Sequence, residues 1–320
     1  MKTAALALVA CATAAGQSNP LLLPADIAAL DRGEAIGRVV KAKDDGDIGL
    51  FGAVRLPQSK EAFLVWYRSE GFKQSEMIEA AGIFHNPAVP GDLDRFRFEP
   101  GELRKLQACK PGLCVSKLTD AEIAALGKDV NWAASDAVEQ AAGLMRVLTA
   151  DYVSGYQARG NAALGSYLDK GRPVDIWAAA RTLASNFASL RELYPDLFER
   201  IEGKTRPGGG EDDFIYWSRE NYGFGFKPTL SISHVIVRRA PHVVVIASKQ
   251  LRASHYQDGS LGFTIVADCP GGGSYLAYAS RSRFDLLRSG GWKRAIAERR
   301  LPALTKREME RMRTRLAAVK

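Results

Sequence analysis

Long apolar runs, cysteines and histidines are all scarce in this chain of 320 residues. Beyond the N-terminus, no run approaches the ~18 apolar residues that a membrane-spanning helix requires. Four cysteines and four histidines leave little material for a zinc site, which needs about four ligands. The sequence also lacks a nucleophile elbow, a zinc-binding helix motif and a glycine-rich nucleotide loop. No motif identifies an enzyme, and we expect neither a metal nor a cofactor.

The overall composition is that of an ordinary globular protein, with 46% apolar and 25% charged residues. The net charge of +8 is distributed unevenly, because residues 293–320 contain ten Lys or Arg and three Glu. The rest of the chain is nearly neutral. The basic character therefore belongs to the C-terminal tail and not to the folded body.

The N-terminus is typical of an export signal. A lysine at the second position precedes a short apolar run, 3–10, and small residues follow it. We therefore expect a signal peptide over residues 1–15. The sequence Leu-Val-Ala-Cys that ends at Cys11 also resembles a bacterial lipoprotein processing site, at which Cys11 would be lipidated and would anchor the protein. Both routes predict a periplasmic or otherwise extracytoplasmic location.

Cysteine spacing agrees with export. Cys109 and Cys114 enclose a Pro-Gly pair, which favours a turn that brings the two ends together. In an oxidising compartment we expect a disulfide between them. It would stabilise the turn more than the fold, because loop-closure stabilisation is smallest for short loops. Cys269 is predicted to be a strand-end residue rather than a nucleophile.

Two strand-like runs, 35–42 and 48–55, flank the sequence Asp-Asp-Gly-Asp at 44–47. Asp-Gly between such runs predicts a hairpin. The acidic cluster lacks the ligand spacing and the closing Glu of a calcium loop, so we predict no metal there. Ser59 and, further on, Thr119 should cap helices.

The middle of the chain, 119–205, is predicted to be a helical insertion. Residues 132–157 and 176–193 carry broad apolar stripes at helical spacing. These helices lack His or paired acids at ligand spacing, so we assign them to core packing. Short strands are predicted at 77–84 and 115–118.

The most informative segment is 214–285, where the pattern predicts four or five long strands joined by turns. His234 lies on the apolar face of one strand, and Lys249 and His255 share a face of a strand predicted over 243–257. Burying an unpartnered polar group costs roughly 2–7 kcal/mol. These residues are therefore expected to contact a ligand in a cavity, to pair with protein groups, or to be turned outward by the twist of the strand.

If His234, Lys249 and His255 pair with protein groups, Asp285 and Glu220 are the suggested partners. Arg281 and Arg283 on the last strand would bind a carboxylate or phosphate, or form a solvated strand edge. Tyr216 and Trp217 are most simply core aromatics. The full set of candidate ligand-binding residues is His234, Lys249, His255, Tyr278, Arg281 and Trp217.

Two segments carry a resemblance to a known family. Phe-Gly-Ala-Val-Arg-Leu-Pro at 51–57, leading into Glu-Ala-Phe at 61–63, and the ending from Tyr278 to Asp285 before a basic helix resemble the START-type (polyketide-cyclase-like) helix-grip superfamily. The match covers 35–68 and 213–300. It implies an α+β fold, a curved antiparallel sheet with a C-terminal helix and a hydrophobic cavity between them, formed as a single domain over 25–320. Members bind lipids or other apolar molecules, a few are enzymes, and no catalytic residue is carried over.

The basic tail, 293–320, is predicted to be amphipathic. Met309, Met312, Leu316 and Val319 recur at helical spacing, with basic residues opposite. Such a helix lies on an anionic membrane or packs its apolar stripe on the body. Nucleic acid is not expected, because the chain carries an export signal and its body is neutral. Pro302 should break or kink the helix that begins near Phe284.

Three functions are consistent with these patterns. The favoured one is an exported envelope protein that binds a lipid-like or other apolar ligand in a helix-grip cavity, with peripheral membrane contact through the tail. The second is an enzyme in the same cavity, with His255 or His234 as general base and Lys249 stabilising negative charge. The third is a structural envelope protein without a small ligand.

Overall fold

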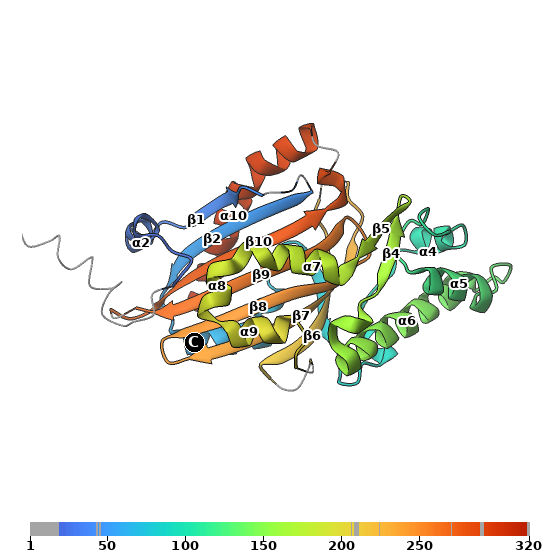
Figure 1. The fold of residues 1–320 in the computed structure, drawn as a ribbon, viewed down its shortest axis with the longest axis horizontal. Helices are drawn as coiled ribbons and strands as arrows, with labels where there is room; N and C mark the ends of the chain where they lie inside the picture. The colour runs from blue at the N-terminus through green and yellow to red at the C-terminus, as the bar shows by residue number, and fades with distance from the viewer. Residues whose placement is uncertain are drawn as a thin grey trace, which may run out of the picture. The chain divides into compact units, whose positions relative to one another are not determined.

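The computed structural model describes residues 19–42, 44, 46–205, 207, 211–223, 225–269, 271–288 and 291–318. The predicted signal peptide, Cys11 and Val319 lie outside these residues. The fold is α+β, as predicted, with a curved antiparallel sheet of eight strands, several helices and a helix at the C-terminus (Figure 1).

The elements have the following bounds. In spatial order the sheet contains β1 (Ile36–Val40), β2 (Asp47–Leu56), β10 (Ser274–Phe284), β9 (Gln257–Asp268), β8 (Val243–Ala253), β7 (Thr229–Ala240), β6 (Asp213–Glu220) and β3 (Ile78–Ile83). A separate hairpin pairs β4 (Ser166–Asp169) with β5 (Arg172–Asp175). The helices are α2 (Pro24–Asp31), α3 (Lys60–Ser69), α4 (Pro100–Leu106), α5 (Asp120–Asp129), α6 (Ala137–Arg159), α7 (Ile176–Ala184), α8 (Ala188–Leu193), α9 (Pro195–Ile201) and α10 (Trp292–Ala318).

The chain divides into two compact units. Unit 1 contains residues 1–76, 237–248 and 261–320, and unit 2 contains residues 77–236 and 249–260. Strands β7, β8 and β9 each contribute residues to both units. The helical segment 119–205 belongs to unit 2.

In unit 1, α10 packs on the N-terminal hairpin. β1 and β2 pair antiparallel as predicted, with Gly37 opposite Gly52. A Cβ at Gly37 would lie 2.2 Å from the carbonyl oxygen of Pro302, and one at Gly52 would lie 2.8 Å from Cγ2 of Thr305. The two glycines therefore allow the backbone of α10 to approach the sheet closely.

Of the two predicted effects of Pro302, the break of the last helix is wrong, and the kink stays a prediction. α10 begins at Trp292, and Phe284 instead ends β10. Pro302 lies inside the helix, which continues to Ala318. A proline removes one backbone hydrogen bond, and the close packing of this turn on β1 holds the helix together across it.

The helix cap predicted at Ser59 in unit 1 is confirmed, and the acidic turn at 44–47 has protein partners. The hydroxyl of Ser59 accepts a hydrogen bond from the amide of Ala62, 3.3 Å away, at the start of α3. Asp44 and Asp47 bind an arginine: Nε of Arg283 donates to Asp47 Oδ1 at 2.6 Å, and its Nη2 donates to Asp44 Oδ2 at 3.0 Å. The acidic turn and the last strand are thus joined by ion pairs.

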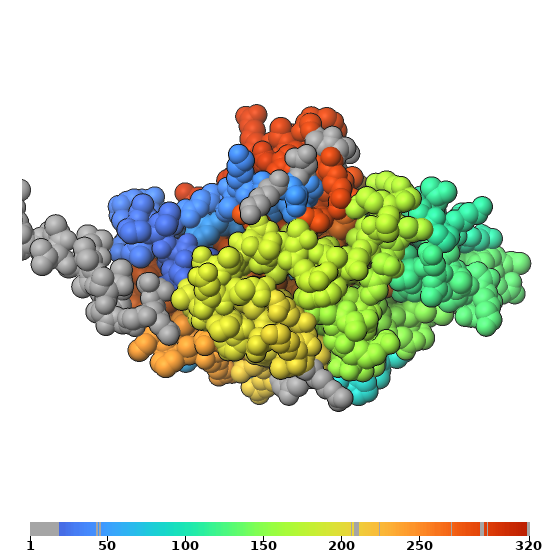
Figure 2. Space-filling view, viewed as in Figure 1, coloured from blue at the N-terminus to red at the C-terminus, as the bar shows by residue number. Residues whose placement is uncertain are grey.

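Unit 2 contains two apolar clusters. One surrounds Tyr156 and Trp217, both completely buried, and the other lies where α4 and α5 pack on α6. Thr119 caps α5 in a capping box with Glu122, as the sequence suggested. Helices α7, α8 and α9 form part of the surface of this unit, yellow-green to yellow in Figure 2.

Three predicted elements of unit 2 differ from the structure. The helix predicted from Trp132 begins at Ala137, because the preceding residues form a turn in which Trp132 Nε1 donates to the carbonyl of Leu126. The helix predicted over 176–193 is interrupted, because Ser185 Oγ donates to the carbonyl of Thr182 and competes with the helical backbone. Residues 115–118 form no strand.

The strand predicted over 243–257 ends at Ala253. The chain then reverses through a turn in which Tyr256 has a φ of 60°, in the left-handed region. In the sequence His255 follows the same odd-numbered alternation as Lys249, but in the structure it lies in this turn. It is therefore not on the strand face that carries Lys249.

Candidate ligand-binding site

Lys249 is completely buried in unit 2 and is bound by protein groups. Its Nζ donates to Asn161 Oδ1 at 2.7 Å and to the carbonyl of Ile201, at the end of α9, at 2.8 Å. Nζ also lies 5.0 Å from the centroid of the Tyr156 ring and 5.5 Å from that of Trp177. Burial disfavours the ammonium and lowers the pKa of Lys249 to about 7, while the charge of Asp213 opposes this shift.

His234 forms a buried chain with two neighbours. Its Nε2 lies 2.5 Å from Asp213 Oδ1, and its Nδ1 lies 2.9 Å from the hydroxyl of Tyr156. Burial lowers the pKa of His234, with the carboxylate of Asp213 opposing the shift, and burial raises the pKa of Tyr156 well above its usual value. A neutral imidazole satisfies both contacts, because Nε2–H donates to the carboxylate and Nδ1 accepts from the tyrosine hydroxyl.

His234 and Lys249 therefore lie together, as the period-two pattern suggested, and both contact Tyr156. Their contacts are with protein groups, and these differ from the suggested Asp285 and Glu220. Glu220 instead accepts from Ser218 Oγ at 2.7 Å and from the hydroxyl of Tyr222 at 2.5 Å.

A pocket lies in another part of unit 2. Its cavity volume is about 50 Å³. The apolar side chains in its wall are Phe96, Phe98, Leu103, Leu106, Met145, Pro228 and Leu230. The polar residues in its wall are Arg97, Glu99, Glu102, Ser116, Arg219, Ser254 and His255. Helix α4 and the segment before it, 96–99, supply half of the lining residues, and the turn after β8 supplies Ser254 and His255.

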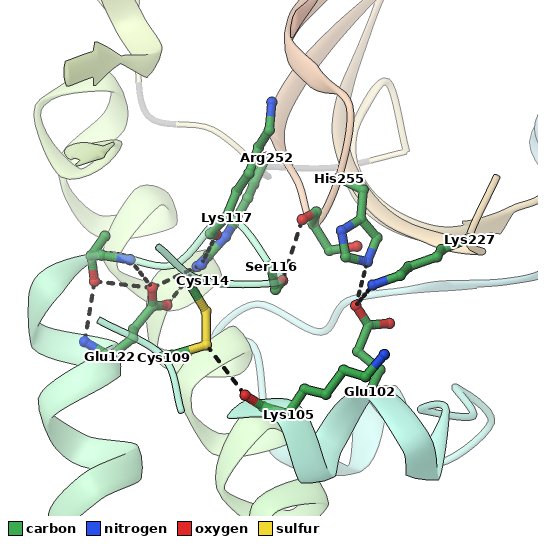
Figure 3. Close-up of a disulfide and its surroundings, with 12 residues drawn as sticks. Glu102, Lys105, Cys109, Cys114, Ser116, Lys117, Glu122, Lys227, Arg252 and His255 are labelled. Carbon is green, nitrogen blue, oxygen red and sulfur yellow. Dashed lines mark hydrogen bonds and ion pairs between the residues drawn. A yellow bond between two sulfur atoms is a disulfide. The ribbon is translucent and has the colours of Figure 1, made fainter. Parts of the chain in front are cut away.

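His255 lies in the wall of this pocket and faces Glu102 of α4 (Figure 3). Its Nε2 is 2.7 Å from Glu102 Oε1, and Nζ of Lys227 is 3.6 Å from the same oxygen. Burial favours the neutral form of this carboxyl, but His255 and Lys227 hold the pKa of Glu102 below its ordinary value. The pocket thus combines apolar walls with a largely buried contact between a carboxylate and a histidine.

The predicted disulfide is present beside the pocket, with the Cα atoms of Cys109 and Cys114 4.4 Å apart (Figure 3). It joins the end of α4 to the segment that carries Ser116. Ser116 Oγ donates to the carbonyl of Ser254 at 3.3 Å, and the amide of Lys117 donates to the same carbonyl at 2.9 Å. The disulfide loop therefore links two walls of the pocket.

Two buried acidic residues hold this loop on the sheet. Arg252 binds Glu122 through two contacts, of 2.5 and 2.8 Å, and donates to the carbonyl of Lys117 at 2.8 Å. Asp258 accepts from Lys117 Nζ at 2.7 Å and from the hydroxyl of Tyr167 at 2.8 Å. Burial alone would raise the pKa of Asp258, but these partners lower it to about 2.

Sequence reasoning missed Glu102 and Asp258. Neither belongs to a motif, and their partners are distant in the chain: Lys117 lies 141 residues from Asp258. For Glu122 a signal was available, because Thr119 and Glu122 have the spacing of a capping box.

The remaining candidates lie in other environments. Trp217 is a core aromatic whose Nε1 donates to the carbonyl of Asp92 at 2.7 Å. Tyr278 and Arg281 belong to unit 1, where Nη1 of Arg281 donates to the carbonyls of Val40 and Lys41 at 3.2 and 2.8 Å. Burial lowers the pKa of Arg281, with Asp47 opposing the shift.

No protein-family model matches the chain, and no curated protein resembles it significantly. Within the described part of the chain, no helix combines the length and apolar character that crossing a membrane requires. In the same residues, no cluster of three or more His, Cys, Asp or Glu side chains is placed to hold a metal ion.

Proposed function

We propose that the protein binds a small apolar molecule, or the apolar end of a lipid-like one, in the pocket beside α4. The observation that carries this proposal is the combination of an apolar wall with one polar contact that points into it, between Glu102 and His255. Apolar walls favour burial of a hydrophobic ligand, and a few placed polar groups orient it. The cavity implied by the helix-grip resemblance would lie against α10, so this proposal places the ligand elsewhere, in unit 2.

The size of the pocket restricts the ligand. Its volume of about 50 Å³ is well below the ~300–1,000 Å³ of pockets that enclose drug-sized ligands. Only a small group fits the pocket in this form, and a longer ligand requires α4 to move outward. We therefore expect affinity to increase with the first few carbon atoms of an alkyl chain and then to level off.

We also propose that the protein is exported and acts in the periplasm or cell envelope. The disulfide between Cys109 and Cys114 supports this location, because disulfides persist in oxidising compartments. The N-terminal sequence is the other support.

A second candidate function is catalysis in the same pocket. A carboxylate beside a histidine, as in the pair of Glu102 and His255, is the arrangement that orients a general base. His255 is a better candidate than His234, because both ring nitrogens of His234 are already engaged by Asp213 and Tyr156.

The binding proposal is tested by titrating the oxidised protein with fatty acids of increasing length, using calorimetry. Met145→Phe should fill the pocket and weaken binding at least about tenfold. Leu148→Phe is a matched control on the same helix, because Leu148 packs in the α4–α5–α6 cluster but does not line the pocket. Equal affinities for the two variants would place the ligand elsewhere, and no binding by the parent protein would refute the proposal. His255→Gln should retain apolar binding while abolishing any turnover.

A further inference from the structure

Helix α10 presents apolar side chains to solvent among basic ones. Trp292 is 70% exposed, Ile296 44% and Leu304 38%. The exposed basic residues around them are Arg299, Arg300, Lys306 and Arg307. Residues 292–307 contain six Lys or Arg and a single Glu. This face therefore combines strong positive charge with large exposed apolar groups.

This face differs from the apolar stripe noted in the sequence. Met309 and Leu316 of that stripe are 4% and 1% exposed, and the side chain of Met309 lies over Gly52 of β2. Those residues hold α10 on unit 1. At about 100° per residue, Ile296 and Arg307 fall on the side of the helix away from Met309, and Trp292 lies about a quarter turn from it.

The first turns of α10 contact the hairpin through Arg294, whose Nη2 donates to the carbonyl of Asp47 at 3.3 Å, and they precede the closest contact of the helix with it. That contact involves Pro302 and residues that follow it, such as Thr305. Within 292–300, most of the described side chains are exposed. Trp292 and Ile296 thus lie in the part of the helix that precedes this closest contact, and Leu304 lies within it.

We propose that residues 292–307 of α10 bind the surface of an anionic phospholipid bilayer. Trp292, Ile296 and Leu304 would enter the boundary between headgroups and acyl chains, where tryptophan is enriched. The arginines and Lys306 would contact the anionic headgroups. This combination of an apolar stripe and flanking basic residues is that of helices lying in the membrane interface.

The face carries both basic and exposed apolar residues, and this combination favours a membrane over other anionic partners. A bilayer surface offers anionic headgroups together with an apolar layer. A nucleic acid would engage the basic residues through its phosphates, but that contact would leave Ile296 and Leu304 in water. The inference rests on unit 1 alone and does not depend on a ligand in the pocket of unit 2.

The test is co-sedimentation of the full chain with vesicles of phosphatidylcholine containing phosphatidylglycerol, and with vesicles of phosphatidylcholine alone. Every form carries Cys11→Ser, so that a lipid attached at Cys11 does not supply the binding. We expect the parent to bind the anionic vesicles, and Trp292→Ser with Ile296→Ser to weaken that binding about tenfold or more. Arg300→Gln with Arg307→Gln should weaken it too, and more so at low salt.

Val65→Ser is the matched control, because Val65 is an apolar residue of unit 1 that is 71% exposed on α3; it should bind like the parent. Three results would overturn the proposal: no binding of the parent to anionic vesicles, equal loss in the Val65 variant, or unchanged binding when Trp292 and Ile296 are replaced. If binding is unchanged when Trp292 and Ile296 are replaced, and if a DNA duplex binds in a way that depends on Arg300 and Arg307, the face would instead be assigned to a polyanion.

Discussion

Replacing Lys249 with Met should stabilise the protein, and the gain should be largest at low pH. In the folded protein the pKa of Lys249 is lowered to about 7, whereas an unfolded lysine titrates near 10.4. Between these pH values the unfolded chain binds a proton that the folded chain does not, so the stability of the parent rises with pH. Below pH 7 the lysine is charged in both states, and the full cost of burying that charge lowers the free energy of unfolding. This cost is about 4–5 kcal/mol at 1.36 kcal/mol per pKa unit.

The substitution also removes hydrogen bonds. Asn161 Oδ1 would lose the donor that now lies 2.7 Å away, at a cost of about 1–3 kcal/mol. The carbonyl of Ile201 would keep Asn161 Nδ2 as a donor, at 3.2 Å. The expected net gain is therefore about 2–3 kcal/mol near pH 6 and close to zero near pH 9.5, where the remaining penalty of the lysine is only about 1 kcal/mol.

The assay is urea unfolding of parent and variant at about pH 6 and pH 9.5, with the disulfide intact. The neighbouring groups that titrate or carry charge, Asp213, His234, Arg200 and Tyr156, are present in both proteins. Removing Lys249 also removes a positive charge that lowers the pKa of His234, which adds to the gain at pH 6 and not at pH 9.5. Lys117→Met is the control, because Nζ of Lys117 pairs with Asp258 and its removal should destabilise. A stability difference between parent and Lys249→Met that is the same at both pH values would refute the reasoning.

Three further outcomes follow from other contacts. Gly37→Ala should lower the thermal unfolding temperature, because its Cβ would lie 2.2 Å from the carbonyl of Pro302; Gly101→Ala in α4, with nothing within 4 Å of its Cβ, should not lower it. In an acid titration monitored by circular dichroism, the parent should lose about 2 kcal/mol of stability between pH 4 and 2, because the pKa of Asp258 is lowered to about 2 and its favourable ionisation is lost as it protonates. Asp258→Asn should not show this loss of stability. An identical acid response in the two proteins would contradict the assignment of the loss to Asp258. Cys109→Ser with Cys114→Ser should lower stability by about 2 kcal/mol in denaturant unfolding, the modest value expected for a short loop, and a much larger loss would mean that the disulfide holds more than the turn.

Residues close together in the sequence were sufficient to predict much of the local structure. The Asp-Gly turn predicted the hairpin of β1 and β2, Ser59 and Thr119 predicted two helix starts, and the Pro-Gly pair predicted the disulfide turn. Each of these features depends on residues within a few positions of one another. The errors occurred where nonlocal packing or a side chain overrode the local pattern, as at Pro302 and Ser185.

The sequence by itself assigned His234 and Lys249 to mainly apolar strand faces, because alternation on a strand assigns each side chain to a face; the structure shows that both are buried. The sequence also determined that the basic charge would concentrate at the C-terminus. Only the tertiary structure decided what these groups contact: Asn161 lies 88 residues from Lys249 along the chain, and Glu102 meets His255 from a different helix. It likewise decided which stripe of α10 is covered, because that depends on two glycines in β1 and β2 that let the helix pack on the sheet. Periodicity specifies a face, whereas the partner of that face is set by the packing of segments far apart in the chain.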